Sequence, residues 1–171
     1  MRTLSWMALL ALTSAVALAQ PCVVEGAFGA GAAGAPDASE PNAHFSLNVL
    51  RASCPDRQFQ AGAFRFATRQ ENRFVEIQMV RLAQLEVDIE NRTATFAGPA
   101  VMSVRTREGV RHVRGIVRVQ VWDNRPRGSE EGNPDAIAVQ FFVQDRTDPL
   151  FTYRGAVLRG DILVFRHERS R

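Results

Sequence analysis

HVRGIVRVQVWDNRPRGSEEGNPDAIAVQFFVQ, residues 112–144, is the stretch that decides the fold of this chain. Val117, Val119 and Val121 alternate with polar or charged residues, and a similar alternation resumes after residue 135. A period of two is typical of half-buried strands, because successive side chains of a strand point to opposite faces. The intervening residues 123–135 are mainly turn formers and charges. The sequence therefore predicts an antiparallel strand pair with one face in the core and the other in water.

Alternating runs of this kind recur along the chain, and turn residues separate them. Gly98-Pro99 and Arg159-Gly160-Asp161 each predict the end of one strand and the start of the next. No segment has a convincing helical period. The spacing predicts an all-β fold, either an antiparallel sandwich or a small barrel, with about nine to eleven short strands.

The N-terminal residues 1–19 predict a secretory signal peptide. Arg2 precedes an apolar stretch, and Ala17-Leu18-Ala19 fits a cleavage site of small residues. The apolar stretch is short for a bilayer span, and no later segment is long and apolar enough for a transmembrane helix. We therefore expect a secreted protein, periplasmic or extracellular, whose mature part is a single β-rich domain over residues 20–171.

The cysteine count and the net charge narrow the class of protein further. Cys22 and Cys54 form an even pair, which in an oxidising compartment predicts one disulfide; two buried free thiols are the alternative. The two cysteines and three scattered histidines show no metal-ligand spacing. A formal net charge of +3 is too close to neutral to indicate nucleic-acid binding.

Several segments share a pattern with a known family. Residues 119–123 read V-x-V-x-D, Gly128 lies in the acidic loop that follows, and residues 135–139 read D-x-I-x-V. Residues 153–162 add a tyrosine, two glycines and an isoleucine, and residues 26–29, 43–49 and 94–98 are also similar. Together they resemble the post-COAP-like β-rich domains of secreted bacterial proteins. The resemblance implies a β-rich fold and an extracellular setting, and it brings no catalytic residues with it.

The acidic loop is the best candidate for a metal site. Ca²⁺ takes hard oxygen ligands, although the spacing here matches no EF-hand and arginines lie among the acids. A solvated loop with internal ion pairs, in which the two aspartates form turns at strand ends, is the alternative. We expect no bound cofactor other than Ca²⁺ at this loop. The five candidate ligands are Asp123, Asn124, Glu130, Glu131 and Asp135.

A group of arginines is the candidate for anion binding. Arginines that share a face on adjacent strands could hold phosphate or an acidic polymer. Glu108 interrupts them and no aromatic residues suggest base stacking, so solvated arginines are the alternative. The candidates are Arg105, Arg107, Arg114 and Arg118.

No motif indicates catalysis, since the chain lacks a G-x-S-x-G nucleophile elbow. We therefore expect a non-enzymatic extracellular or cell-envelope domain with a structural role, or one that binds an unknown protein or envelope component. The alternative is a barrel that carries a small apolar ligand in a cavity lined by phenylalanines. These are Phe45, Phe64, Phe66, Phe96, Phe141, Phe142 and Phe151.

Overall fold

The computed structural model describes residues 22–35, 38–70, 72–125 and 132–169. Within these residues the structure has strands and no helix, so the predicted all-β class is confirmed. The strands are β1 (Cys22–Gly34), β2 (Ala43–Cys54), β3 (Arg57–Gln70), β4 (Arg73–Met79), β5 (Gln84–Asp88), β6 (Thr93–Thr106), β7 (Gly109–Trp122), β8 (Ala136–Phe142) and β9 (Phe151–Arg169).

All nine strands belong to one antiparallel sheet with the order β4-β3-β2-β1-β9-β8-β7-β6-β5. Strand β4 pairs with β6 as well as with β3, so the sheet closes into a ring. The ring is uneven, because β6 pairs with β4 over residues 100–105 and with β5 over residues 93–97. The predicted strand pair is also present, as β7 and β8.

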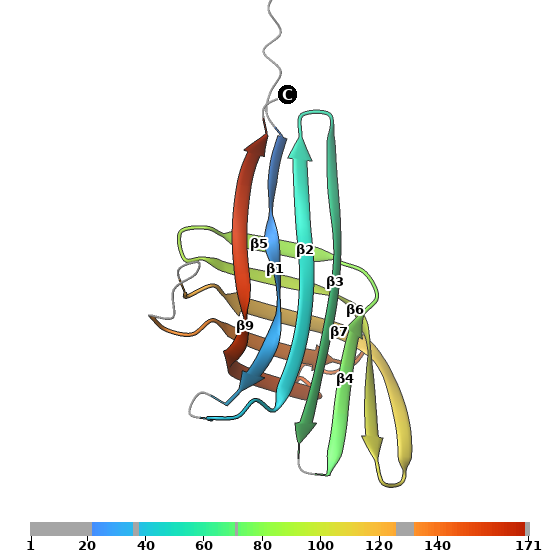
Figure 1. The fold of residues 1–171 in the computed structure, drawn as a ribbon. Coiled ribbons are helices and arrows are strands. Elements are labelled where there is room, and N and C mark those ends of the chain that lie inside the picture. Colours follow the sequence, from blue (N-terminus) through green and yellow to red (C-terminus); the bar gives the residue numbers. More distant parts are fainter. Residues whose placement is uncertain (1–21, 36–37, 71, 126–131, 170–171) are drawn as a thin grey trace, which may run out of the picture.

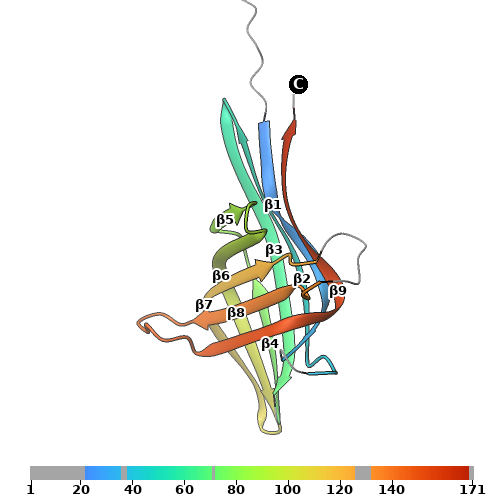
Figure 2. The same cartoon turned by 90° about the vertical axis from the view of Figure 1, so that its left-hand side faces the viewer.

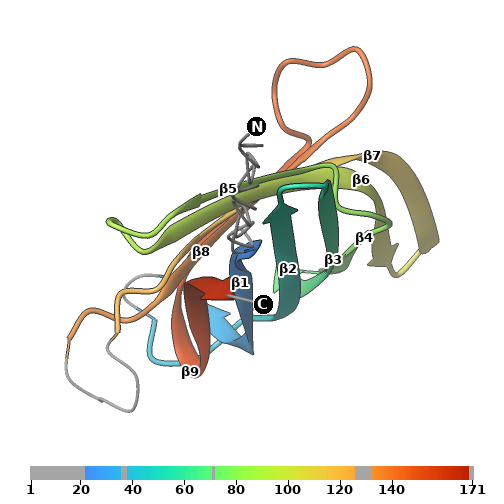
Figure 3. The same cartoon turned by 90° about the horizontal axis from the view of Figure 1, so that it is seen from above.

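The ring is flattened into two layers whose strands cross (Figure 1). Strands β1, β2 and β3 form the upright layer in that view, and β5 to β8 run across behind it. Figure 3 shows the two layers face to face. Crossed layers of this kind need strands that change direction at the corners. Strand β9 does so, since it starts beside β8 and then turns to run beside β1 (Figure 2).

The corner of β9 falls where the sequence predicted a turn. The register with β1 shifts between Ala32 and Ala33, which leaves Leu158 as the extra residue of a β-bulge. Gly160 follows with a φ of 91°, and a side chain there would collide with the Ala30 carbonyl oxygen. The predicted break at residues 159–161 is therefore wrong, because the bulge and a glycine bend the strand without ending it.

The break predicted at Gly98-Pro99 is also wrong for β6, which runs through both residues. The interruption lies in the partner, between β4 and β5, where the Val80 N–H donates to the Pro99 oxygen at 2.8 Å. A strand residue directs its N–H and its C=O to the same neighbour, and proline has no N–H to donate. A side chain at Gly98 would also collide with the Arg81 carbonyl oxygen. Gly98 and Pro99 therefore mark the interruption between β4 and β5, while their own strand, β6, continues.

Aromatic rings fill the space between the layers. The Phe66 ring centroid lies 4.9 Å from that of Tyr153, and the Phe64 ring lies 5.5 Å from that of Phe96. The Tyr153 hydroxyl donates to Asn42 Oδ1 at 3.0 Å, and burial raises its pKa to about 12. Of the phenylalanines predicted to line a cavity, all are buried except Phe142, which is half-buried, and several pack on one another.

The predicted disulfide is confirmed. Cys22 at the start of β1 is bonded to Cys54 at the end of β2, with 4.3 Å between the two Cα atoms. The sequence separation of 32 residues corresponds to roughly 3–4 kcal/mol of stabilisation if the bond acts by restricting the unfolded chain.

The position of Phe66 makes a stability prediction. Its side chain is 1% exposed, so Phe66→Ala is expected to lower the free energy of unfolding by about 3–5 kcal/mol, as deletion of a core ring does. Phe59, which is 57% exposed on the same strand, is the control, and Phe59→Ala is expected to change it by less than about 1 kcal/mol. Urea denaturation measures both, and equal losses would contradict this description of the core.

Candidate functional site

Two buried aspartates hold the connection between β7 and β8. Asp123 and Asp135 are each 2% exposed. Asp135 Oδ1 accepts the backbone N–H groups of Asn124 at 2.9 Å and Arg125 at 3.0 Å, and its Oδ2 accepts that of Ile162 at 2.9 Å. The Asp135 carboxylate is therefore hydrogen-bonded inside the core, as a buried charged group must be.

Asp123 completes this arrangement from the other side of the connection. Its Oδ2 accepts the Val164 N–H at 3.1 Å, and its Oδ1 accepts from the Arg92 guanidinium, with which it forms an ion pair. Because Ile162 and Val164 lie on β9, the two aspartates attach the ends of β7 and β8 to the strand that joins the layers.

These contacts bear on the predicted Ca²⁺ ligands. Asp123, Asn124 and Asp135 do lie together, and the Asn124 side chain donates to the Pro134 oxygen at 2.9 Å. Glu130 and Glu131 lie outside the described residues. Among the residues that the structure describes, no three His, Cys, Asp or Glu side chains are placed to hold a metal ion. Binding of Ca²⁺ at this loop stays a prediction.

A third acid, Asp161 on β9, approaches the same pair from the surface. Burial raises its pKa, and a hydrogen bond to Asp135 and the charges of Asp135 and Asp123 raise it further. The raised pKa means that ionised Asp161 is less favourable in the folded chain than in the unfolded one.

The substitution Asp161→Asn tests this charge cluster. The penalty for ionising Asp161 is absent below the unfolded pKa of about 4 and grows as pH rises through the raised folded pKa. The variant is therefore expected to be more stable than the wild type at neutral pH, with an advantage that fades towards pH 4 and below. Thermal unfolding across this pH range measures the difference. A difference that does not vary with pH would contradict the assignment.

Two hairpins bring arginines together at one end of the molecule. Arg105 pairs with Phe74, so the tip of the β6–β7 hairpin lies beside the tip of the β3–β4 hairpin. A surface hollow of about 320 Å³ between them is lined by four arginines and three other residues. These residues are Arg69, Asn72, Arg73, Phe74, Arg105, Thr106 and Arg107.

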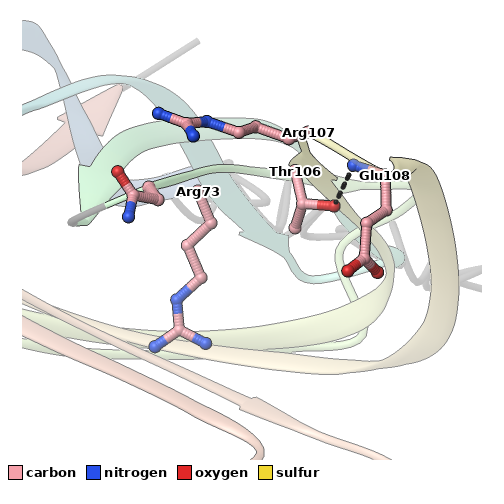
Figure 4. A pocket seen from close by; sticks show the side chains of 5 residues that line it. Arg73, Thr106, Arg107 and Glu108 are labelled. Carbon is pink, nitrogen blue, oxygen red and sulfur yellow. Dashed lines mark hydrogen bonds between the residues drawn. The ribbon is translucent and has the colours of Figure 1, made fainter.

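The neighbouring hollow, of about 410 Å³, is shown in Figure 4. Thr106 Oγ1 accepts the Glu108 N–H at 3.2 Å there, which fixes the hairpin turn. The guanidinium groups of Arg73, at the start of β4, and of Arg107, in the β6–β7 turn, point in different directions (Figure 4). The basic groups are thus spread around the end of the molecule.

The structure divides the predicted arginine group. Arg105 and Arg107 lie together, whereas Arg114 lies opposite Val101 farther along the outer face of the ring. Arg118 lines a different hollow, of about 470 Å³ on the outer face of β7–β9, where the Arg154 guanidinium lies 5.4 Å from the Trp122 ring centroid.

Arg69 and Arg73 were missing from the predicted group. They lie on the other hairpin, and only the β4–β6 pairing brings them beside Arg105 and Arg107. No local pattern in the sequence signals that pairing.

An apolar cleft opens beside these arginines. Strand β8 pairs with β7 only from Ile116 onward, so residues 109–115 of β7 have β6 as their one paired neighbour among the described strands. The cleft next to this free edge has a volume of about 360 Å³. Its lining comprises the apolar Val75, Met102, Val104, Val113, Leu150 and Phe151 and the polar Gln70, Arg73, Arg111 and Thr152.

The cleft has a buried apolar part and an exposed polar part. Val75 and Met102 are 2% and 3% exposed, whereas Arg73 and Arg111 are exposed. A comparable gap lies near β5, but polar side chains bridge it. There the Arg51 guanidinium donates to the Leu85 oxygen at 3.2 Å and Gln60 Nε2 donates to the Ala83 oxygen at 3.0 Å. A smaller hollow of about 220 Å³ lies on β5 and β6, and its lining includes the charged Glu86 and Arg118.

The end of the molecule formed by the β3–β4 and β6–β7 hairpins carries more basic than acidic side chains. The two side-chain ion pairs of the described residues, Glu25–Arg51 and Arg92–Asp123, both lie elsewhere. The acids of residues 69–79 and 102–114 are Glu71, which lies outside the described residues, Glu76 and Glu108. The arginines of the same segments are Arg69, Arg73, Arg105, Arg107, Arg111 and Arg114.

Comparisons with known proteins give no relative for this arrangement. No protein-family model, no curated protein and no solved structure matches the chain. Across its described residues the structure has no helix long and apolar enough to cross a membrane.

Proposed function

We propose that the protein is a non-enzymatic domain of the extracellular space or cell envelope that binds an anionic partner through its arginine-rich end. The observation that carries the proposal is the hollow lined by Arg69, Arg73, Arg105 and Arg107, none of which forms an ion pair with a described acid. Guanidinium groups are planar forks of donors that match carboxylate and phosphate oxygens. Several of them on one surface also attract an anion from a distance.

The compartment is supported by two features. The apolar leader ends in a cleavage-site pattern, and the Cys22–Cys54 disulfide is of a kind that persists in oxidising surroundings. The resemblance to post-COAP-like domains points to the same setting.

One Ser–His contact resembles a nucleophile–base pair, but its position on the outer face favours a binding role over a catalytic one. Ser103 Oγ lies 2.8 Å from His112 Nδ1, on neighbouring strands. The histidine is exposed, and neither side chain lines the hollows or the cleft described above. A nucleophile–base pair works with a third group that orients the base and with donors that stabilise an oxyanion. A hydrogen bond on an open strand surface is the simpler account.

Binding of tripolyphosphate, measured by isothermal titration calorimetry, tests the proposal. The wild type is expected to bind with an affinity that falls as salt is added. The double variant Arg69→Gln/Arg105→Gln removes two charged donors from the hollow, and about a tenfold loss of affinity per arginine is expected.

The matched control is Arg57→Gln/Arg166→Gln, which has the same net charge as the first double variant. It removes two exposed arginines that line neither the two hollows at the hairpin tips nor the cleft. It is expected to bind almost as the wild type does. Equal losses in the two variants, or no salt-dependent binding by the wild type, would overturn the proposal.

A further inference from the structure

The structure assigns a ligand class to the apolar cleft. We propose that the anionic partner is a single amphiphile, with its alkyl or acyl chain in the cleft and its acidic headgroup between Arg73 and Arg111. The inference rests on the proposed function and goes beyond it, because a purely electrostatic site needs no apolar cleft.

The spacing along two strands carries the argument. Alternate residues of a strand share a face, so Arg73 lies on the same side of β4 as Val75, and Arg111 lies on the same side of β7 as Val113. All four side chains line the cleft. Each arginine therefore lies two residues along its strand from an apolar lining residue, and the two strands flank β6. Two guanidinium groups at the mouth of an apolar cleft complement a molecule with one acidic end.

The cleft walls fit a hydrocarbon chain. Val75, Met102 and Phe151 are buried, and Val104 and Val113 are half-buried against the core. A volume of about 360 Å³ lies near the lower end of the usual range for small-molecule sites. Leu150 at the edge is 43% exposed, and a bound chain would remove part of that apolar surface from water.

A protein partner would use the same region differently. The free edge of β7 at residues 109–115 could pair with an extended peptide, in which case backbone hydrogen bonds would provide most of the affinity. The observations favour the amphiphile, because the arginines and the apolar residues line one cleft and are not spread along the edge.

A series of alkyl phosphates distinguishes these cases. Hexyl, octyl and decyl phosphate are titrated into the wild-type protein below their micellar concentrations, with inorganic phosphate as the reference. Burial of each added methylene is expected to raise the affinity about fourfold until the chain fills the cleft. Affinity that does not depend on chain length would overturn the inference, as would an acidic peptide that displaces decyl phosphate and binds more tightly than it.

A substitution that fills the cleft provides the second arm. Val104→Phe is expected to abolish the dependence on chain length while tripolyphosphate still binds, and Val113→Phe serves if the first variant does not fold. Val87→Phe is the matched control, since Val87 is also a half-buried valine against the core but lies on β5, away from the cleft.

The outcomes separate this inference from the proposed function. If tripolyphosphate binds the wild type but longer alkyl phosphates gain nothing, the inference fails and the arginine-rich end still binds anions. If neither probe binds, both fail. A chain-length dependence that Val104→Phe removes and Val87→Phe preserves supports both.

Discussion

The pairing of β4 with both β3 and β6 is the interaction on which the rest of the structure depends. It turns an open sheet into a ring, so the neighbouring strands lose the free edges that would otherwise invite pairing with other chains. Strand β4 is short, however, so it closes the ring along only part of β6. The strands diverge on either side of this closure. One gap is bridged by Arg51 and Gln60, and the other is the apolar cleft.

Charged groups take two different roles in this fold. Asp123 and Asp135 lie in the interior, where backbone N–H groups and Arg92 satisfy their oxygens and attach the β7–β8 connection to β9. A buried carboxylate without such partners would be strongly destabilising. Arg73 and Arg107 lie on the surface near Glu108 and form no ion pair with a described acid, and we propose that their donors bind a ligand. Burial and pairing thus separate structural charges from candidate binding groups.

Local patterns predicted which faces of the strands are buried, but they did not predict the closure of the sheet into a ring. Alternation placed Val117, Val119 and Val121 in the core, and the even cysteine count predicted the disulfide. Gly98 was misread, because a turn residue can mark a corner or a broken neighbour while its own strand continues. The β4–β6 pairing joins residues far apart in the chain, and no period encodes it. The joining of Arg69 with Arg105, and the cleft itself, were therefore beyond prediction from sequence.

The central claim is that the opening left by partial closure of the ring is a ligand site. Hydrogen exchange with and without octyl phosphate tests it most directly, because exchange reports local protection along the backbone. Slower exchange is predicted in residues 109–115 of β7 and at Phe151 and Thr152, with no change along the other free edge, β5. Unchanged exchange at the cleft under saturating ligand, or equal slowing at β5, would contradict the claim.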